Sequence, residues 1–183
     1  MKTYEVAIVG VPPGLLMHRF SPEDEAALVA LVQKRSGKKP TNEEYAECAA
    51  YRLESGELCQ PAEHIYQAMC KAASAFRIKG QGKKTYKSAV KGNILISPEY
   101  ISHGRKDYEI DLRPVRIGNA RIMRARPLLR EWRLSFMIGV IDDDDVPGEI
   151  VQAVLVEAGQ KIGIGDYRPR YGRFIVESFK AAD

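Results

Sequence analysis

The sequence has little cysteine, little histidine and no long apolar run, and each shortage disfavours a class of protein. Its three cysteines, Cys48, Cys59 and Cys70, form no C-x-x-C pair, which disfavours a disulfide scaffold and a zinc ribbon. We expect them to be small buried apolar side chains in a reducing, cytoplasmic compartment. No apolar stretch approaches the roughly 18–20 residues of a membrane span, so no membrane partner is expected. The N-terminal segment carries Glu5 within its apolar stretch and predicts a strand rather than a signal peptide.

Several catalytic and cofactor motifs are also missing from the sequence. It contains no G-x-x-x-x-G-K-[ST], no G-x-S-x-G, and no G-x-G-x-x-G followed by an acidic partner. ATPase, serine hydrolase and dinucleotide oxidoreductase functions are therefore disfavoured, and no cofactor is expected. The three histidines form no paired metal-ligand spacing, and the four aspartates at 142–145 are interpreted as helix N-terminal charge, so no metal site is predicted.

Two of the histidines, His64 and His103, are expected to be a structural residue and an exposed turn residue, respectively. His18 directly follows the first predicted strand and is the one candidate general base, for a metal-independent ribonuclease.

Charge is unevenly distributed along the 183 residues, although the net charge is only +4. Residues 23–63 hold nine acids against five bases, whereas residues 77–91 hold six bases and no acid. Residues 113–133 then hold seven arginines with Glu131 as the only acid. This segregation indicates a polyanionic partner.

The order of predicted elements indicates the fold class. Residues 2–9 predict a strand, helices follow from Ser21, Thr41 and Pro61, and strands are predicted over 93–101, 107–117 and 131–141. A helix over 149–162 and a strand over 173–179 complete the chain. We therefore expect an α+β, ferredoxin-like (βαββαβ, RRM-like) antiparallel sheet with a helical insertion after the first strand and another insertion between the middle strands. Residues 1–183 would form one domain, with helices in 22–92 and the strands, last helix and glycine-rich loop in 93–183.

The segment GIGDYRPRYGRF, between the last helix and the last strand, combines three residue types that suit a nucleic acid. Its glycines allow positive φ or the close approach of a ligand to the backbone. Its arginines offer forked donors for phosphates, and its tyrosines offer flat faces on which unpaired bases stack. The alternative is a structural turn in which arginine and tyrosine brace the sheet.

Three segments resemble the RAMP superfamily, the ferredoxin-fold proteins of CRISPR RNA-guided complexes. IGIGDYRPRYGRFIV is similar to its glycine-rich loop, which contacts RNA; GELCQPAEHIYQAMCKAA is similar to its module of short strand, proline and helix; and VPPGLLMHRF resembles its loop after the first strand. Small phage and prophage proteins of unassigned role are similar over nearly the whole length. The resemblance implies an RNA or single-stranded DNA ligand, self-association along it and a phage origin. We expect a chain of this length to lack the extended thumb of such subunits.

These observations predict a non-catalytic, single-stranded nucleic-acid-binding protein that assembles along the strand. The predicted contacts are Lys79, Lys83, Lys84 and Lys87 in one loop, Arg121, Arg124 and Arg126 as a track, and Gly163, Gly165, Tyr167, Arg168, Arg170, Tyr171 and Arg173 in and beside the glycine-rich loop. Two alternatives stay open. One is the endoribonuclease that uses His18, and the other is a phage factor that binds a host protein complex.

Overall fold

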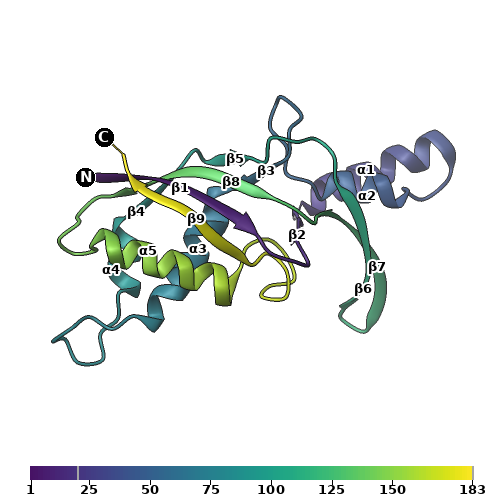
Figure 1. Ribbon diagram of the computed structural model, residues 1–183. Helices are drawn as coiled ribbons and strands as arrows, with labels where there is room; N and C mark the ends of the chain where they lie inside the picture. Colours follow the sequence, from purple (N-terminus) through teal and green to yellow (C-terminus); the bar gives the residue numbers. More distant parts are fainter. Residues whose placement is uncertain (20, 183) are drawn as a thin grey trace.

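The computed structural model describes residues 1–19 and 21–182, with the backbone alone at 117 and 120. This part of the chain forms five α-helices and antiparallel sheets, which confirms the predicted α+β class (Figure 1). The elements are β1 (Lys2–Gly10), β2 (Leu15–Leu16), α1 (Pro22–Ser36), α2 (Asn42–Cys48), β3 (Cys59–Pro61), α3 (Ala62–Ala72), the 3-10 turn η1 (Ala73–Ala75), α4 (Lys87–Asn93), β4 (Ile94–Ser97), β5 (Tyr100–Ser102), β6 (Glu109–Ile117), β7 (Ala120–Leu129), β8 (Arg133–Val140), α5 (Gly148–Glu157), the π-helical turn η2 (Ala158–Ile162) and β9 (Phe174–Ala181). Among the described residues, no helix combines the length and the apolar character that crossing a membrane requires.

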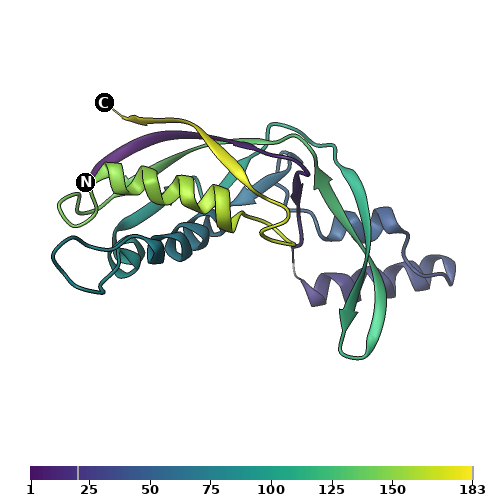
Figure 2. The same cartoon turned by 60° about the horizontal axis from the view of Figure 1, so that its bottom comes forward.

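The main sheet has the strand order β4-β8-β1-β9, and all neighbouring strands are antiparallel. α3 lies between β1 and β4 in the chain, and α5 lies between β8 and β9. Figures 1 and 2 show α3 and α5 side by side on one face of this sheet. The predicted sequence of strands and helices is therefore present, with insertions after the first strand and between the middle strands.

The core forms where α3 and α5 meet the main sheet. In each of these elements, the residues on the side that faces the core are apolar. Alternate residues of β8, from Leu134 to Val140, are buried, as the period of two of a half-buried strand requires. In α3 one face is buried from Ile65 to Ala72, at helical spacing. In α5 the buried face is centred on Val151 and Leu155, and Ile150 is only partly buried. Each fully buried large side chain contributes about 1.5–3 kcal/mol to folding.

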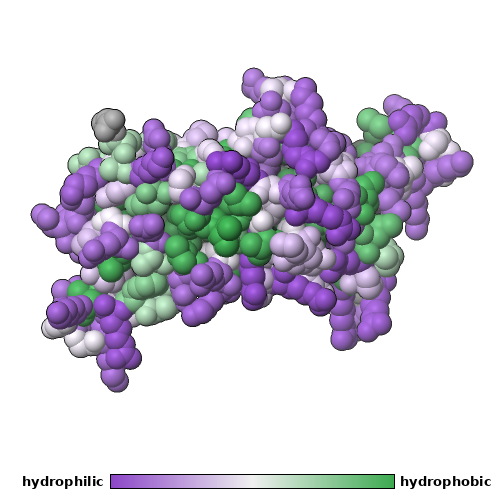
Figure 3. Space-filling view, in the orientation of Figure 1, coloured by the Kyte–Doolittle hydropathy of each residue, from purple (hydrophilic) through white to green (hydrophobic). Residues whose placement is uncertain are grey.

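A second sheet, of order β2-β7-β6, carries a long hairpin away from the core. Its two long strands project beside α1 and α2, at the opposite end of the molecule from α4 (Figures 1 and 2). The surface of this hairpin is mixed, since Arg116 and Arg121 are exposed on it together with Leu112, Ile122 and Met123. Figure 3 accordingly shows green beside purple on the right of the molecule, and further apolar side chains gather in the middle of that face.

The insertion after the first strand begins with the VPPGLLMHRF segment, of which Phe20 lies outside the described residues. α1 begins after Ser21 with Pro22 in its first turn, and α2 begins after Thr41, at the two helix starts that were predicted. A complete capping box between Thr41 and Glu44 fixes the start of α2. Only Val32 is buried in α1, so this helix contributes little to the core.

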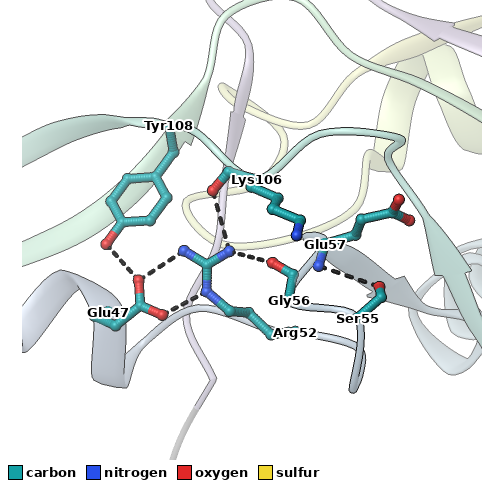
Figure 4. A network of polar contacts seen from close by, with 7 residues as sticks. All are labelled: Glu47, Arg52, Ser55, Gly56, Glu57, Lys106 and Tyr108. Carbon is teal, nitrogen blue, oxygen red and sulfur yellow. Dashed lines mark hydrogen bonds and ion pairs between the residues drawn. The ribbon is translucent and has the colours of Figure 1, made fainter.

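Arg52 fastens the turn that precedes β3 to the segment that follows β5 (Figure 4). Its guanidinium donates to the carbonyl oxygens of Gly56 at 2.7 Å and Lys106 at 3.0 Å, and to the carboxylate of Glu47. The Tyr108 hydroxyl donates to the same carboxylate at 2.9 Å, and burial raises the pKa of Tyr108 to about 12. One side chain thus joins α2, a turn and the approach to β6.

The cysteines follow the expectation in large part, since Cys59 and Cys70 are buried and Cys48 is half-buried, and all three are free thiols. The aspartates at 142–145 close the turn before α5. Asp142 Oδ1 accepts from the backbone N–H of Asp144 at 3.1 Å, and Asp145 Oδ2 accepts from the Asn93 side chain at 2.8 Å.

The expectation that His103 is exposed is wrong. Its imidazole packs edge-on against Trp132, with ring centroids 6.3 Å apart. Both ring nitrogens are buried, and neither has a hydrogen-bond partner within residues 1–19 and 21–182. Burial and the nearby Arg105 charge lower the pKa of His103 to about 4. The burial of His103 could not be predicted from the sequence, because the Trp132 ring that it packs against is distant in the chain.

Folding stability should therefore fall on acidification. The pKa of His103 is below its unfolded value of 6.5, so its contribution is complete above pH 6.5 and is lost as the pH falls towards 4. Between pH 7 and pH 4.5 this group should cost about 2 kcal/mol of unfolding free energy. Urea titration of the wild type and of His103→Phe at both pH values measures it. An equal pH dependence in the two proteins would refute this assignment.

Candidate functional site

The glycine-rich loop runs from η2 to β9 and occupies the joint between the two sheets. Gly163, Gly165 and Gly172 all have positive φ. A Cβ at Gly165 would lie 2.5 Å from the carbonyl oxygen of Leu16, and one at Gly172 would overlap the carbonyl oxygen of Ile164. The freedom of these glycines is therefore used inside the protein, where the loop packs on the segment around β2.

The two tyrosines of the loop have different environments. Tyr167 is 46% exposed, whereas Tyr171 is only 7% exposed and packs with Leu16 and Leu128. Their rings meet edge to face, with centroids 6.1 Å apart. The structure thus leaves Tyr167 as the accessible aromatic face of the loop.

Exposed cations surround Tyr167. Arg168, Arg170 and Arg173 are all exposed, and the first two flank Pro169 in the loop. A shallow groove of about 470 Å³ runs between this loop and the helices, and its lining adds Lys71 of α3 and Lys161 of η2 to Tyr167 and Arg168. The loop and two helical lysines therefore form one basic surface.

The predicted lysines lie elsewhere. Lys79, Lys83, Lys84 and Lys87 are exposed on the loop between η1 and α4 and at the start of α4. That loop projects at the opposite end of the molecule from the hairpin (Figures 1 and 2). The structure therefore separates these lysines from the glycine-rich loop and from the hairpin arginines.

The three hairpin arginines do not form one track. Arg121 is exposed near the turn of the hairpin, and strand alternation places it on the opposite face of β7 from Arg124 and Arg126. Arg124 Nη1 donates to both carboxylate oxygens of Glu25 at 2.7 Å. Arg126 is buried, and its Nε lies 2.9 Å from Asp166 Oδ2. Two of the three are thus engaged with carboxylates of the protein itself.

His18 lies beside this buried ion pair. Its Nδ1 is 3.7 Å from Asp166 Oδ2, and it lines a cavity of about 300 Å³ together with Glu25, Arg124 and Arg126. Burial lowers the pKa of His18, outweighing the nearby Asp166 carboxylate. The imidazole is therefore neutral at pH 7 and able to accept a proton.

Sequence reasoning missed Asp166 and Arg113 as organisers of this region. Asp166 is the only acid among the arginines of the loop, and such an isolated acid is a signal for a buried ion pair. Arg113 of β6 contacts Asp111, Tyr167 and Tyr171. The Asp111–Arg113 spacing of two residues on one strand places both side chains on one face, which was the available signal.

Removing the charge of Asp166 should destabilise the fold. Asp166→Asn leaves the buried Arg126 guanidinium without its carboxylate, and because Asp166 is 30% exposed we expect a loss of about 1–3 kcal/mol. Asp107→Asn is the matched control, since Asp107 pairs with Arg105 at the surface and should leave the unfolding midpoint unchanged. Chemical denaturation at pH 7 compares them, and equal effects would contradict the role of the buried pair.

Comparison with known proteins finds a similar structure but no match to the sequence. No known protein family and no curated protein matches the sequence. Among solved structures, the fold is similar to a chain in the cryo-EM structure of the type III-B Cmr-beta bound to cognate target RNA, with a TM-score of 0.58 and 11% sequence identity. The alignment covers 100% of this chain and 61% of that chain, so the protein spans about three fifths of its structural neighbour. At this identity the likeness shows the fold.

Proposed function

We propose that this protein binds single-stranded RNA or DNA through the glycine-rich loop, without catalysis. The observation that carries the proposal is the exposed cluster of Tyr167, Arg168 and Arg170 on a loop that the fold holds rigidly against the segment around β2. Arginine forks bind phosphates, and an exposed aromatic ring stacks with an unpaired base. Lys71 and Lys161 extend the same basic surface along the groove.

The fold and its likeness support the same proposal. We infer a ferredoxin-like domain of the RAMP type, because the βαββαβ order and the strand order β4-β8-β1-β9 fit that topology. The structural neighbour belongs to a complex bound to target RNA, which favours RNA over DNA.

In this proposal the loop lysines and the hairpin arginine Arg121 contact the strand at its two ends, outside the glycine-rich loop. Copies would assemble along the strand, with the acidic surface of α1 and α2 facing the basic surface of the next copy. Sedimentation of the protein as a monomer on an oligonucleotide several sites long would exclude this assembly.

Binding should depend steeply on salt because phosphate contacts dominate it. We expect a labelled 30-mer of single-stranded RNA to bind, and Arg168→Ala/Arg170→Ala to lower both the affinity and the slope of log K against log salt, the slope by about two units. Fluorescence anisotropy over a salt series measures both quantities.

The matched control is Lys106→Ala/Lys180→Ala, which removes the same charge from exposed side chains outside the groove, the hairpin arginines and the surface of α1 and α2. This variant should bind like the wild type. Equal losses in both double variants would show that only net charge matters, and absence of binding at low salt would redirect the search to protein partners.

Metal-independent RNA cleavage is a second candidate, favoured by the neutral His18 in a cavity beside two arginines. In this reaction His18 accepts the proton of a ribose 2′-hydroxyl, whose oxygen attacks the adjacent phosphorus. The 5′-oxygen leaves with a proton from solvent, which gives a 2′,3′-cyclic phosphate and a 5′-hydroxyl end.

This candidate predicts cleavage of labelled RNA in EDTA. Because the pKa of His18 is lowered, the rate should already be at its plateau at pH 7 and should decline only below about pH 6.5. His18→Ala should abolish cleavage, and His64→Gln should retain it. RNA that stays intact with the wild-type protein would remove the candidate.

A further inference from the structure

Tyr167 has an unusual backbone for a bulky residue. Its φ of 60° makes it the one non-glycine residue with positive φ in the described part of the chain. This left-handed conformation brings the Cβ of an L-residue close to the backbone and is a genuine outlier for an aromatic side chain. The residue is nevertheless 46% exposed, so burial of the side chain does not account for the positive φ. Strained residues of this kind gather at binding and catalytic sites.

The guanidinium of Arg113 packs against the ring of Tyr167. The guanidinium carbon of Arg113 lies over the Tyr167 ring at 5.2 Å and over the Tyr171 ring at 4.5 Å from each centroid. The planar guanidinium thus makes a cation–π contact with each of the two rings. The Tyr171 ring adds an edge-to-face contact, and 46% of the Tyr167 surface is left to solvent.

Arg113 is itself held in place. Its Nε donates to Asp111 Oδ2 at 2.5 Å, and its Nη2 donates to Asp111 Oδ1 at 2.9 Å and to the Tyr171 hydroxyl. Hydrogen bonding to Asp111 raises the pKa of Arg113, so its charge is fixed. With Nε and Nη2 engaged by Asp111 and Tyr171, the guanidinium is held beside the two rings, in a position suited to support a ring.

We propose that Tyr167 forms the seat for one unpaired nucleobase and that Arg113 is the positioning residue that sets the angle of its ring. The inference rests on the proposed function and specifies one subsite within it. The base stacks on the solvent side of the ring, while Arg168 and Arg170 contact the phosphates on either side. Recognition at this subsite tolerates any base, since every base has a flat face.

The strain at Tyr167 permits a test that separates binding from folding. Glycine accepts φ of 60° without steric cost, so in Tyr167→Gly the relief of strain should offset the lost ring contacts with Arg113 and Tyr171, and the unfolding temperature should stay close to that of the wild type. Its affinity for a single-stranded 30-mer should nevertheless fall about tenfold, and Tyr167→Phe should keep the wild-type affinity.

The positioning role is tested by the salt slope. Arg113→Gln should lower the affinity several-fold with an unchanged slope of log K against log salt, whereas loss of a phosphate contact in Arg168→Ala should reduce the slope by about one unit. Arg113→Lys keeps the charge but not the fork, and it should also bind weakly. Circular dichroism and thermal unfolding of each variant confirm that the fold is retained, and Arg113→Lys serves if Arg113→Gln does not fold.

Each outcome is decisive. If the wild type binds and Tyr167→Gly binds equally well, the base seat is refuted while the proposed function stands. A reduced slope for Arg113→Gln would make Arg113 a phosphate ligand and overturn the positioning role. A wild type that fails to bind any single strand at low salt would refute both the proposed function and this subsite.

Discussion

The backbone contact between the glycine-rich loop and the segment around β2 is the constraint on which the rest of the site depends. The N–H of Asp166 donates to Leu16 O at 2.8 Å, the N–H of Gly172 donates to Gly14 O at 2.8 Å, and β2 pairs in turn with β7. A Cβ at Gly165 would collide with the carbonyl oxygen of Leu16 across this contact, and one at Gly172 would collide with the carbonyl oxygen of Ile164 within the loop. The loop is therefore a fixed joint between the main sheet and the hairpin, and the positions of its exposed residues follow from that joint.

The joint divides the arginines into two groups that a charge count does not distinguish. Arg113, Arg124 and Arg126 face carboxylates of the chain and hold the hairpin, the loop and α1 together. Arg168 and Arg170 stand outside, on the same loop that Arg126 helps to anchor. Part of the basic run at 113–133 is thus used for ion pairs within the protein. This is why an even track of arginines along the hairpin was a reasonable prediction and still does not match the geometry.

Local periodicity predicted the elements of the main sheet, because α3, α5 and β8 each bury one face against a common core. The capping box at Thr41 and Glu44 was equally predictable, since its partners are three residues apart. Features that depend on distant partners were not predictable in this way. The burial of His103 depends on Trp132, and the burial of Tyr171 but not of Tyr167 depends on packing with Leu16 and Leu128. The composition of the loop was enough to identify it in the sequence. The residues that support it are distant in the chain, so only the folded structure shows them.

The geometry also bears on the form of nucleic acid that the proposed site would accept. Arg168 and Arg170 offer contacts that any phosphate backbone satisfies, duplex or single-stranded. An aromatic ring such as that of Tyr167, by contrast, stacks only with a base that has left its neighbours in a helix. A duplex could therefore contact the arginines through its phosphates, but it offers no unpaired base to stack on the Tyr167 ring. In the proposed function, preference for a single strand therefore arises at one strained residue, and affinity arises from the cations around it.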